Sequence, residues 1–391
     1  MRLLLAHNRY QHYGGEDAVF DAESALLTEA GLTVTTHVVT NDHITGFGAR
    51  LRSGFEAPYS RRARAAFAAQ IRRDRPDVVH VHNLFPLLTP AILDACRDEG
   101  VPVVATLHNY RTLCASGLRV RNGKPCSLCV QGSPYWAVVH RCYRNSVLGS
   151  LAASNTVMLH RKLESWQRKV RLFITMSDFA RAEFIAAGFP AERLVVKPNF
   201  VPDPGHAPGE QADKAGVLYV GRLSFEKGIH VLLDAWKTAK TPLTIIGDGP
   251  DVDAVRAAQS KTVTYLGAQN AAQVLAAMRR HRFLVVPSIV FEGCPRVVAE
   301  AFAAGLPIIA SRIGSLQELI RDGVNGLHAV AGDPVSLAET VDAAAADPER
   351  AAALGRNARV AYEQAFTPDQ TLRQLLQVYN TVLRPVRPEF V

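Results

Sequence analysis

The stretch Phe291-Glu-Gly-Cys-Pro-Arg-Val-Val-Ala-Glu300 indicates the fold of this 391-residue chain. It follows an apolar run at 282–287 that is typical of a buried parallel strand. Glycine and proline then interrupt the chain, and Pro295 stands where a proline starts a helix well. A helix to Ala304 and a further buried strand at 306–310 are expected. The pattern therefore predicts a loop and a helix start at the carboxyl end of a strand, where open α/β sheets bind ligands.

The same stretch carries two carboxylates, Glu292 in the loop and Glu300 inside the helix. The free backbone N–H groups at the start of a helix suit an anion. Two glutamates can also stand on a buried helix without a function, but the surrounding residues favour a site. The segment closely resembles the E-x7-E signature of retaining GT-B glycosyltransferases, family 4 in particular, and the matching residues are Ser288, Glu292, Gly293, Pro295, Glu300, Ala301, Ala303, Gly305 and Pro307.

The resemblance implies roles for the residues of this loop and helix. By that resemblance, Glu300 holds the ribose hydroxyls of a nucleotide sugar, and Glu292 holds the hydroxyls of its sugar. The backbone amides of Gly293 and Cys294 are expected to help. No residue stands out as a covalent nucleophile, so we expect attack from the leaving-group face, with the β-phosphate taking the acceptor proton.

A second motif, Gly221-Arg222-Leu-Ser-Phe-Glu-Lys227-Gly228, places two cations in a loop between a strand and a helix. Arginine grips phosphate with two parallel hydrogen bonds, and lysine acts as a point charge. A solvated basic loop is the plain alternative, but the stretch resembles the family's G-R-L-x-x-x-K-G segment. The resemblance implies that Arg222 and Lys227 clamp a diphosphate and stabilise the charge left as the glycosidic bond breaks. Because side chains neutralise the leaving group, no catalytic metal is expected.

Further positions complete the predicted donor site. Gly14 and Gly15 follow the first strand, and the family has a matching turn that lets the backbone approach the donor phosphates. Gly247 begins a G-D-G-P turn like that of the family, and Leu266 lies where the family holds the nucleobase against the backbone. The dinucleotide fingerprint G-x-G-x-x-G is absent from the first loop, which argues against a dehydrogenase.

Histidines mark the other half of the predicted site. His108 ends a strand at the rim of the first sheet, and packing and function are both open for such a residue. The family has a histidine at this point over the donor sugar and acceptor, and His108-Asn109 matches its context. His80 and His82 share one face of a strand, a spacing compatible with metal ligation, but the family's similar strand lines the acceptor cleft. We expect a catalytic His108, with His80, His82 and Asn109 in the acceptor cleft.

Strands alternate with helices along the chain, which predicts βαβ units and parallel sheets. A stretch rich in proline and glycine at 201–216 is the predicted linker. Together with the resemblance, this predicts an α/β protein of the GT-B fold, with two Rossmann-like doubly wound domains facing a cleft. By the resemblance, residues 1–200 are expected to form the acceptor-binding domain and 217–370 the nucleotide-sugar-binding domain. Residues 371–391 are expected to form a C-terminal helix and tail that pack back on the first domain.

An insertion at 109–144 interrupts the first domain and holds four of the six cysteines. A loop of this length in a compact domain is functional or is held by something other than a core. Thiols of a cytosolic enzyme favour a metal over disulfides. A structural zinc is therefore predicted, with reduced thiols and disulfides as open alternatives. The predicted zinc ligands are Cys114, Cys126, Cys129 and Cys142.

Positive charge is concentrated in the first half of the chain. Residues 1–200 hold 25 Lys and Arg against 16 Asp and Glu, whereas the remainder holds 19 against 20. The asymmetry suggests anionic lipid, a lipid-linked pyrophosphate or nucleic acid as a partner, and a basic surface kept for solubility is the alternative. A helix is predicted at 147–170, and its amphipathic part, 157–170, either lies on an anionic membrane or packs inside the domain.

No apolar stretch reaches the ~20 residues that a membrane-spanning helix needs, and the apolar run at the N-terminus is too short for a signal peptide. We therefore expect a cytoplasmic protein. The basic first half and the stretch 157–170 add the expectation that it associates with the inner face of the cell membrane.

The resemblance implies an enzyme, a retaining family 4-like hexosyltransferase. It would move a sugar from a UDP- or GDP-sugar to a saccharide or lipid-linked saccharide acceptor in the assembly of cell-surface polysaccharide or glycoconjugate. A GT-B sugar-nucleotide epimerase shares the fold but is expected to lack the E-x7-E pattern. A zinc-containing nucleic-acid-binding protein would use the insertion and the basic half, yet no stacking aromatics interleave the arginines, so no nucleic-acid partner is expected.

Overall fold

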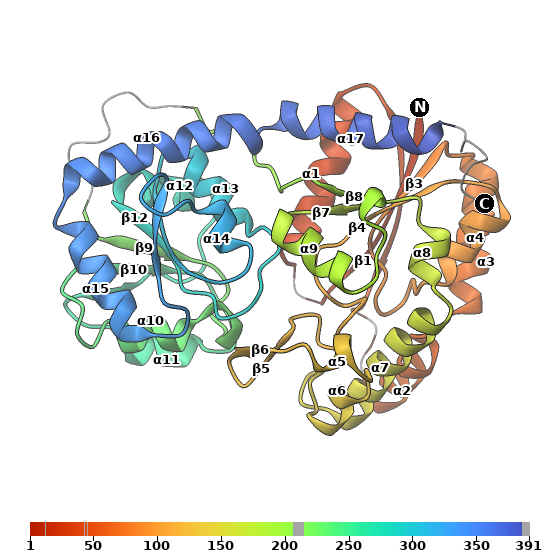
Figure 1. Cartoon of the computed structure of the whole chain (residues 1–391), viewed down its shortest axis with the longest axis horizontal. Helices are drawn as coiled ribbons and strands as arrows, with labels where there is room; N and C mark the ends of the chain where they lie inside the picture. The colour runs from red at the N-terminus through yellow and green to blue at the C-terminus, as the bar shows by residue number, and fades with distance from the viewer. Residues whose placement is uncertain (12, 43, 45, 206–214, 385–391) are drawn as a thin grey trace. The chain divides into compact units, whose positions relative to one another are not determined.

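The computed structural model describes every residue except 12, 43, 45, 206–214 and 385–391 (Figure 1). The chain forms two compact units. The first comprises Met1–Arg121, Cys126–Lys197 and the residues from Thr371 onward, and the second comprises Asn122–Pro125 and Pro198–Gln370. The predicted linker at 201–216 lies partly outside the described residues. The chain thus leaves the first unit after Lys197 and returns to it in its C-terminal helix.

The first unit is built on six parallel strands: β1 (Arg2–Arg9), β2 (Thr33–Thr40), β3 (Val78–Asn83), β4 (Val103–Thr106), β7 (Leu172–Thr175) and β8 (Leu194–Val196). Their order is β2-β1-β3-β4-β7-β8. Every residue of β3 is buried, as expected for a parallel sheet with both faces covered. The strand order reverses between β1 and β3, so the carboxyl ends of these strands flank the switch point where open α/β sheets bind ligands.

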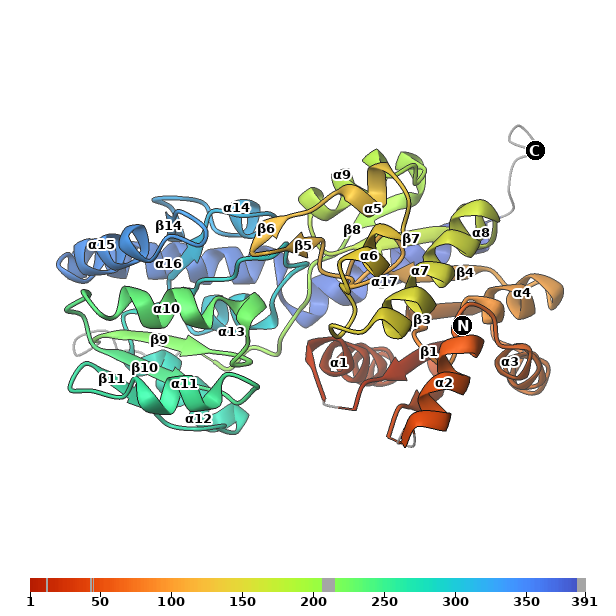
Figure 2. The same cartoon turned by 90° about the horizontal axis from the view of Figure 1, so that it is seen from below.

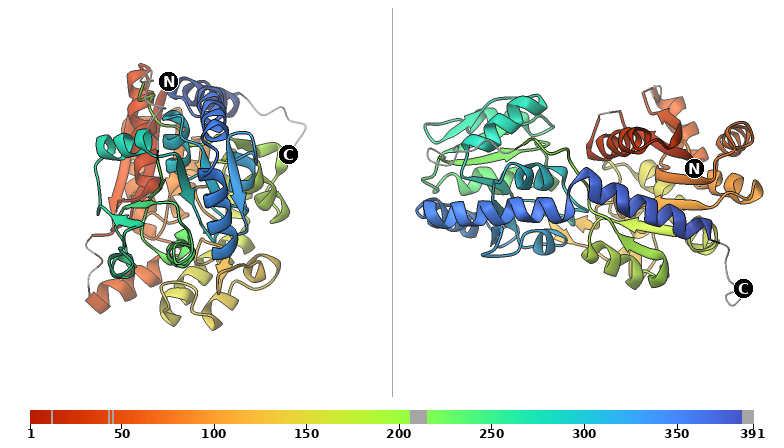
Figure 3. Two further views of the ribbon diagram at one scale, coloured as in Figure 1. Left: turned by 90° about the vertical axis from the view of Figure 1, so that its left-hand side faces the viewer. Right: turned by 90° about the horizontal axis from the view of Figure 1, so that it is seen from above.

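Helices cover both faces of this sheet (Figure 3). Ser60, Ser146 and Ser177 each cap a helix by accepting a backbone N–H of its first turn. The elements around the sheet are α1 (Gly15–Glu29), α2 (Gly46–Glu56), α3 (Arg61–Asp74), α4 (Ala91–Asp98), α7 (Val147–Lys162), α8 (Ser165–Lys169), α9 (Asp178–Ala186) and the short η1 (Ala191–Arg193).

The C-terminal helix α17 (Pro368–Leu383) belongs to the core of the first unit. Leu375 and Tyr379 are fully buried there, in one apolar cluster with Leu3 and Leu5 of β1. Burying side chains of this size stabilises the packed state by about 1.5–3 kcal/mol each. The sheet that starts the chain is therefore completed by its last helix.

The helix predicted at 147–170 is two helices, α7 and α8, and the prediction of one continuous helix is wrong. Glu164 interrupts it with a φ of +47°, a left-handed conformation that a helix cannot continue through. Val157, His160 and Val170 are buried in the first unit. Part of the stretch 157–170 therefore packs inside the unit, whereas Leu163 on the same stretch is 48% exposed.

The second unit repeats the architecture with β9 (Val217–Val220), β10 (Leu243–Ile246), β11 (Val263–Tyr265), β12 (Phe283–Val286), β13 (Ile308–Ser311) and β14 (Gly326–Ala329). The order is β11-β10-β9-β12-β13-β14, so the switch point lies between β9 and β12. Its helical elements are η2 (Phe225–Lys227), α10 (Ile229–Ala235), α11 (Val252–Ala257), α12 (Ala271–Arg280), α13 (Arg296–Ala303), α14 (Leu316–Leu319), α15 (Pro334–Ala345) and α16 (Pro348–Ala365).

The predicted strand–loop–helix–strand pattern is confirmed at β12, α13 and β13. Pro295 is the N-cap of α13, where its missing N–H costs nothing. Val298, Ala299 and Phe302 turn inward and are buried. Gly305 follows the helix with a φ of +64°, the left-handed conformation that ends helices.

The insertion has little regular structure (Figure 2). It contains a hairpin of β5 (Val120–Arg121) and β6 (Lys124–Pro125), followed by the one-turn helices α5 (Leu128–Gln131) and α6 (Trp136–Val139). Its core is small, with Ala115, Cys129, Ala137 and Ala153 at the centre. Three of these four side chains are alanine methyl groups, which bury little apolar area, so the centre of this cluster contributes little packing stability.

Two doubly wound parallel sheets confirm the predicted α/β class. Within the described part of the chain, no helix has both the length and the apolar composition needed to cross a bilayer.

Candidate functional site

Two loops meet at the switch point of the second sheet, one after β9 and one after β12. Lys227 ends the first loop and Glu292 lies in the second, and Lys227 Nζ is 2.7 Å from Glu292 Oε1. Ser288 Oγ donates a hydrogen bond of 2.8 Å to the same carboxylate oxygen. The Lys227 side chain is 32% exposed and that of Glu292 12%, so a ligand can reach the pair. The sequence placed both residues in the donor site, and the structure brings them into contact.

The loop that carries Glu292 is held through its carbonyl groups. Ser315 Oγ donates to the Glu292 carbonyl at 2.7 Å, and Asn199 Nδ2 donates to the Cys294 carbonyl at 2.5 Å. The Cys294 side chain is buried and packs into the unit. The carbonyls on both sides of Gly293 are thus hydrogen-bonded to side chains of the second unit.

Glu300 lies on α13 with its side chain 34% exposed and its Oε1 3.4 Å from Arg296 Nη2. Partial burial raises the pKa of this carboxyl, and the charge of Arg296 opposes that rise. Glu300 therefore takes up a proton at a higher pH than an ordinary surface glutamate does.

Close backbone packing shapes the other side of this switch point. A Cβ on Gly247, whose φ is +148°, would lie 1.9 Å from the Gly221 carbonyl oxygen, so only glycine fits. Arg222 follows with an exposed side chain, and the buried Tyr219 hydroxyl donates to its carbonyl at 2.8 Å. Leu266, at the end of β11, is 48% exposed.

Not every predicted donor residue touches the central pair. Among the described residues, no hydrogen bond or ion pair joins Arg222, Leu266 or Glu300 to Lys227 or Glu292. These side chains are instead presented separately on the second unit.

The switch point of the first sheet carries the Gly14-Gly15 turn. Gly14 is the N-cap of α1, and its N–H donates to Asp17 Oδ2 at 2.9 Å. The other oxygen of Asp17 accepts from the buried His7 Nε2 at 2.9 Å. This chain of bonds fixes the turn to β1. Its N–H groups lie at a helix start, where an anion is favoured.

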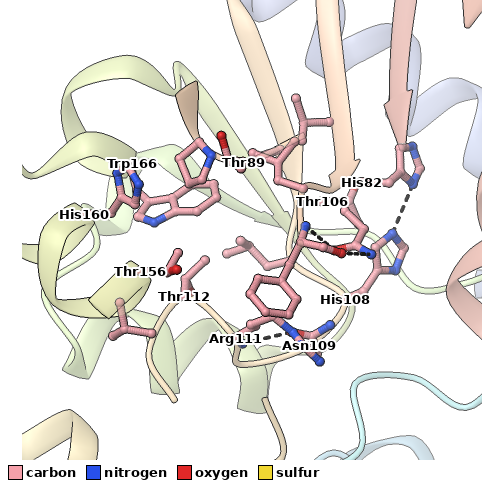
Figure 4. Close-up of a pocket in the computed structure, with 18 of the residues that line it drawn as sticks. His82, Thr89, Thr106, His108, Asn109, Arg111, Thr112, Thr156, His160 and Trp166 are labelled. Carbon is pink, nitrogen blue, oxygen red and sulfur yellow. Dashed lines mark hydrogen bonds between the residues drawn. The ribbon is translucent and has the colours of Figure 1, made fainter. Parts of the chain in front are cut away.

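Asn109 joins the end of β4 to the same helix. Its Nδ2 donates to Glu16 Oε1 at 2.6 Å, and its Oδ1 accepts from the backbone of Arg111 at 2.9 Å. Beside it lies a cavity of about 80 Å³ at the ends of β3 and β4 (Figure 4). This volume holds a few water molecules. The side chains around it include His82, His108, Asn109, Arg111, Thr112, His160 and Trp166.

His80 does not line the cleft for which the sequence predicted it. Its side chain is fully buried, with Nδ1 2.9 Å from the Tyr379 hydroxyl and Nε2 2.8 Å from Thr106 Oγ1. Burial lowers the pKa of His80 to about 3, so the ring is neutral. The prediction is wrong because the buried face of β3 lies under α17, which the sequence pattern did not reveal. His80 fastens α17 to the sheet.

His82 and His108 contact each other. His82 Nδ1 lies 3.0 Å from His108 Nε2, and the two rings stack with centroids 5.2 Å apart. Burial lowers the pKa of both rings well below the usual value, so both are neutral at physiological pH. His82 is also close to Glu23, which the sequence analysis missed.

Glu23 and Lys197 form a second lysine–glutamate pair, inside the first unit. Lys197 Nζ lies 2.7 Å from Glu23 Oε1, and both side chains are buried. A sequence signal for Glu23 existed. It stands on α1 in line with the buried Val19, Phe20 and Leu27, where a charge needs a partner.

All four cysteines of the insertion are free thiols. Burial, with the neighbouring Cys114 and Cys142, raises the pKa of Cys129 to about 12. Across the described ranges, the only groups with ligand atoms close enough to hold one metal ion are Glu23, His80 and His82. The structural zinc stays a prediction, which a metal measurement on the purified protein would test.

Two family models match the chain. "Glycosyltransferase Family 4" covers residues 24–203, and "Glycosyl transferases group 1" covers residues 206–361. Among solved structures, the Anabaena protein HepE in complex with UDP is similar, with a TM-score of 0.70 and 19% identity over 97% of this chain and 100% of that chain. The fold is therefore that of the GT-B glycosyltransferases, as predicted. The chain belongs to the group 1 glycosyltransferases of family 4.

Three curated relatives support this assignment. A glycogen synthase of Mycobacterium tuberculosis is 29% identical over 80% of this chain and 70% of its own length. A phosphatidyl-myo-inositol mannosyltransferase of Mycobacterium leprae is 31% identical over 56% of this chain and 62% of its own length. An uncharacterized glycosyltransferase of Methanocaldococcus jannaschii is 32% identical over 42% of this chain and 47% of its own length. The chain thus spans about half the length of the last of these.

Proposed function

We propose that this protein is a retaining hexosyltransferase that uses a nucleoside diphosphate sugar, a UDP- or GDP-sugar. Its acceptor is a saccharide or lipid-linked saccharide in the assembly of cell-surface polysaccharide. The contact between Lys227 and Glu292 at the switch point of the second sheet carries the proposal. It sets a cation for phosphate and a carboxylate for hydroxyls side by side in the unit matched by the group 1 model.

In this proposal the donor diphosphate replaces Glu292 as the partner of Lys227. The diphosphate binds Lys227 and Arg222, and Glu292 turns its carboxylate to the sugar hydroxyls. The backbone N–H groups of Gly293 and Cys294 help to hold the sugar, and Glu300 accepts the ribose hydroxyls. Gly247 and Leu266 lie along the nucleoside, and the Gly14-Gly15 turn contributes backbone N–H groups to the phosphates.

The reaction needs no group beyond donor, acceptor and these side chains. The bond between the sugar's anomeric carbon and the β-phosphate oxygen breaks, and a bond from that carbon to the acceptor oxygen forms on the same face. The acceptor proton passes to the departing β-phosphate. Lys227 and Arg222 stabilise the growing negative charge, an effect typically worth 10²–10³ in rate per group removed. His108 contacts the sugar or the acceptor.

The test compares two lysines of the second unit. Lys227→Ala is expected to lose transfer and to bind nucleotide more weakly, whereas Lys237→Ala, at an exposed lysine paired with Asp234, should behave like the unmodified protein. A thermal-shift screen with UDP-, GDP- and ADP-sugars first selects the donor. NMR of the product then reads the anomeric configuration. Unchanged turnover in Lys227→Ala, or an inverted anomer, would contradict the proposal.

We also propose that the first unit binds an anionic membrane, which brings it to a lipid-linked acceptor. Part of the stretch 157–170 packs inside the unit, and an apolar surface lies on α6 and the start of α7. Val139 is 66% exposed and Leu148 56%. Arg141 and Arg144 are exposed beside them. We call this surface the α6–α7 patch; its members are Tyr135, Trp136, Val139, Val147, Leu148 and Leu151.

Apolar side chains with arginines between them suit the interface of an anionic bilayer. α6 and α7 form one surface, since the Tyr135 hydroxyl donates to Asn155 Oδ1 at 2.9 Å. Flotation with vesicles containing phosphatidylglycerol is expected to show salt-sensitive binding that Trp136→Ser with Leu148→Ser removes. Val335→Ser with Val360→Ser, at exposed valines of the second unit, is the matched control. No binding at low salt would contradict this part.

A further inference from the structure

The contact between His82 and His108 does not by itself determine which nitrogen of each ring carries the proton. Both are neutral, and their shared hydrogen bond joins Nδ1 of His82 to Nε2 of His108 over 3.0 Å (Figure 4). One of these nitrogens carries the proton and the other accepts it. The choice decides which nitrogen of His108 is left without a proton.

A third group makes that choice. Glu23 Oε2 lies 3.7 Å from His82 Nε2, and neither buried atom has a hydrogen-bond partner of its own. The other oxygen of Glu23 is bound to Lys197 Nζ at 2.7 Å. A carboxylate beside a neutral imidazole favours the tautomer that turns an N–H toward it. His82 should therefore carry its proton on Nε2 and leave Nδ1 as an acceptor.

We propose that Glu23, paired with Lys197, is a positioning residue that sets the tautomers of His82 and His108 in series. With His82 Nδ1 as the acceptor, His108 Nε2 must donate. His108 Nδ1 then has no proton, and no described residue bonds to it. Since His108 lines the cavity at the ends of β3 and β4, it meets a ligand there as a hydrogen-bond acceptor. Resting on the proposed function, this means that His108 accepts a hydrogen bond from a hydroxyl group of the sugar or the acceptor and donates none.

A metal at Glu23, His80 and His82 is the competing interpretation, because their ligand atoms lie within 4.8 Å of one another. Lys197 opposes it, since its ammonium group already lies 2.7 Å from Glu23 and would repel a cation. Both nitrogens of His80 are also engaged, by Tyr379 and Thr106. The arrangement fits a metal site less well than a relay in which the Glu23 carboxylate orients His82 by its charge and a hydrogen bond joins His82 to His108.

The experiment reads the tautomers directly. The full chain is labelled with ¹⁵N-histidine, and long-range ¹H–¹⁵N correlations at neutral pH show which nitrogen of each ring carries the proton. His108→Gln assigns the signals. The expected result is a proton on Nε2 of both His82 and His108. A proton on His108 Nδ1, or a fast mixture of the two tautomers, would overturn the proposal.

Two variants separate positioning from folding. Glu23→Leu with Lys197→Met removes the buried pair as a unit, which buried pairs often tolerate, and His108 should lose its single tautomer while donor KM stays near its original value and kcat falls about tenfold. Tyr379→Phe frees His80 but leaves the relay intact, so the His108 signals should not move. An unchanged His108 spectrum in the double variant would also refute the proposal.

The NMR result does not depend on sugar transfer. If the Nε2 tautomer is found but no nucleotide sugar is turned over, the proposed function fails and the relay stands. If transfer is found but His108 carries its proton on Nδ1, the proposed function stands and the proposed role of Glu23 fails. Should the double variant fail to fold, the tautomer of the unmodified protein still decides.

Discussion

Two lysine–glutamate pairs with the same 2.7 Å separation stand in the two units, and their surroundings differ. Lys227 and Glu292 lie at the carboxyl ends of β9 and β12, partly exposed to solvent. Lys197 and Glu23 lie inside the first unit with side chains 1% and 0% exposed. The same kind of contact thus has a different role in each unit. An accessible pair can exchange its partner for a ligand, whereas a buried pair can only hold its neighbours in place.

The largest expected effect separates the two pairs by stability. Lys197→Met should lower the free energy of unfolding by about 3–5 kcal/mol, because it leaves the Glu23 carboxylate buried without its counter-charge. Lys227→Met should cost about 1 kcal/mol or less, as partly exposed pairs do. Urea unfolding followed by circular dichroism measures both, and hydrogen exchange at the amides of β1 reports the first unit separately.

The double variant Glu23→Leu with Lys197→Met is the control for this comparison. It should recover most of the stability lost in Lys197→Met, since no lone charge remains. If Lys227→Met proved as costly as Lys197→Met, the distinction between an accessible and a buried pair would fail.

The next effect falls on catalysis in the second unit. Glu292→Gln keeps the size of the side chain but removes the charge that is proposed to bind the sugar hydroxyls, so kcat/KM should drop on the order of 10²-fold. The midpoint of urea unfolding should stay close to that of the unmodified protein. Glu339→Gln, at an exposed glutamate of α15, is the matched control. Activity near that of the control would exclude Glu292 from the donor site.

A smaller effect on donor binding is expected from Ser288, which contacts Glu292. Ser288→Ala removes the 2.8 Å hydrogen bond to Glu292 Oε1 and should weaken donor binding by about 1 kcal/mol, or ~5-fold. Calorimetric titration with the donor nucleotide measures the change. An affinity that does not change would show that the Lys227 contact alone orients Glu292.

The smallest expected effect is a pH dependence of nucleotide binding. Partial burial raises the pKa of Glu300, so its carboxylate is lost at a higher pH than that of a surface glutamate as the solution is acidified. If Glu300 accepts ribose hydroxyls, nucleotide affinity should fall as pH drops through this raised pKa. In Glu300→Gln the affinity should be lower and nearly flat over the same range. An identical pH profile in both proteins would remove Glu300 from the ribose site.

The loop after β12 and the helix α13 could be predicted from the sequence because the information for them is local. Pro295, Gly305 and the apolar runs around them encode a strand, a loop and a helix within about thirty residues. That pattern places Glu292 and Glu300 without knowledge of the rest of the chain. Lys227 reaches Glu292 across 65 positions only because both loops leave strands that flank the same switch point.

The buried network of the first unit could not be predicted from the sequence because its residues are far apart along the chain. Lys197 and Glu23 are 174 positions apart, and Tyr379 reaches His80 across 299. No spacing rule relates such residues, so His80 was assigned to a cleft when it lies beneath α17. Glu164 shows a different limit. The apolar periodicity of 147–170 continues through it, although the backbone turns left-handed there.

The place of α17 in the first unit has a consequence for how the protein is made. Translation delivers β1 and β3 early, but Leu375 and Tyr379 leave the ribosome only after the whole second unit has been synthesised. Until then the nascent N-terminal sheet lacks part of its apolar cover, and His80 lacks its tyrosine. The second unit, although later in the sequence, is thus expected to complete its fold first, and the incomplete first unit is expected to bind chaperones until α17 emerges.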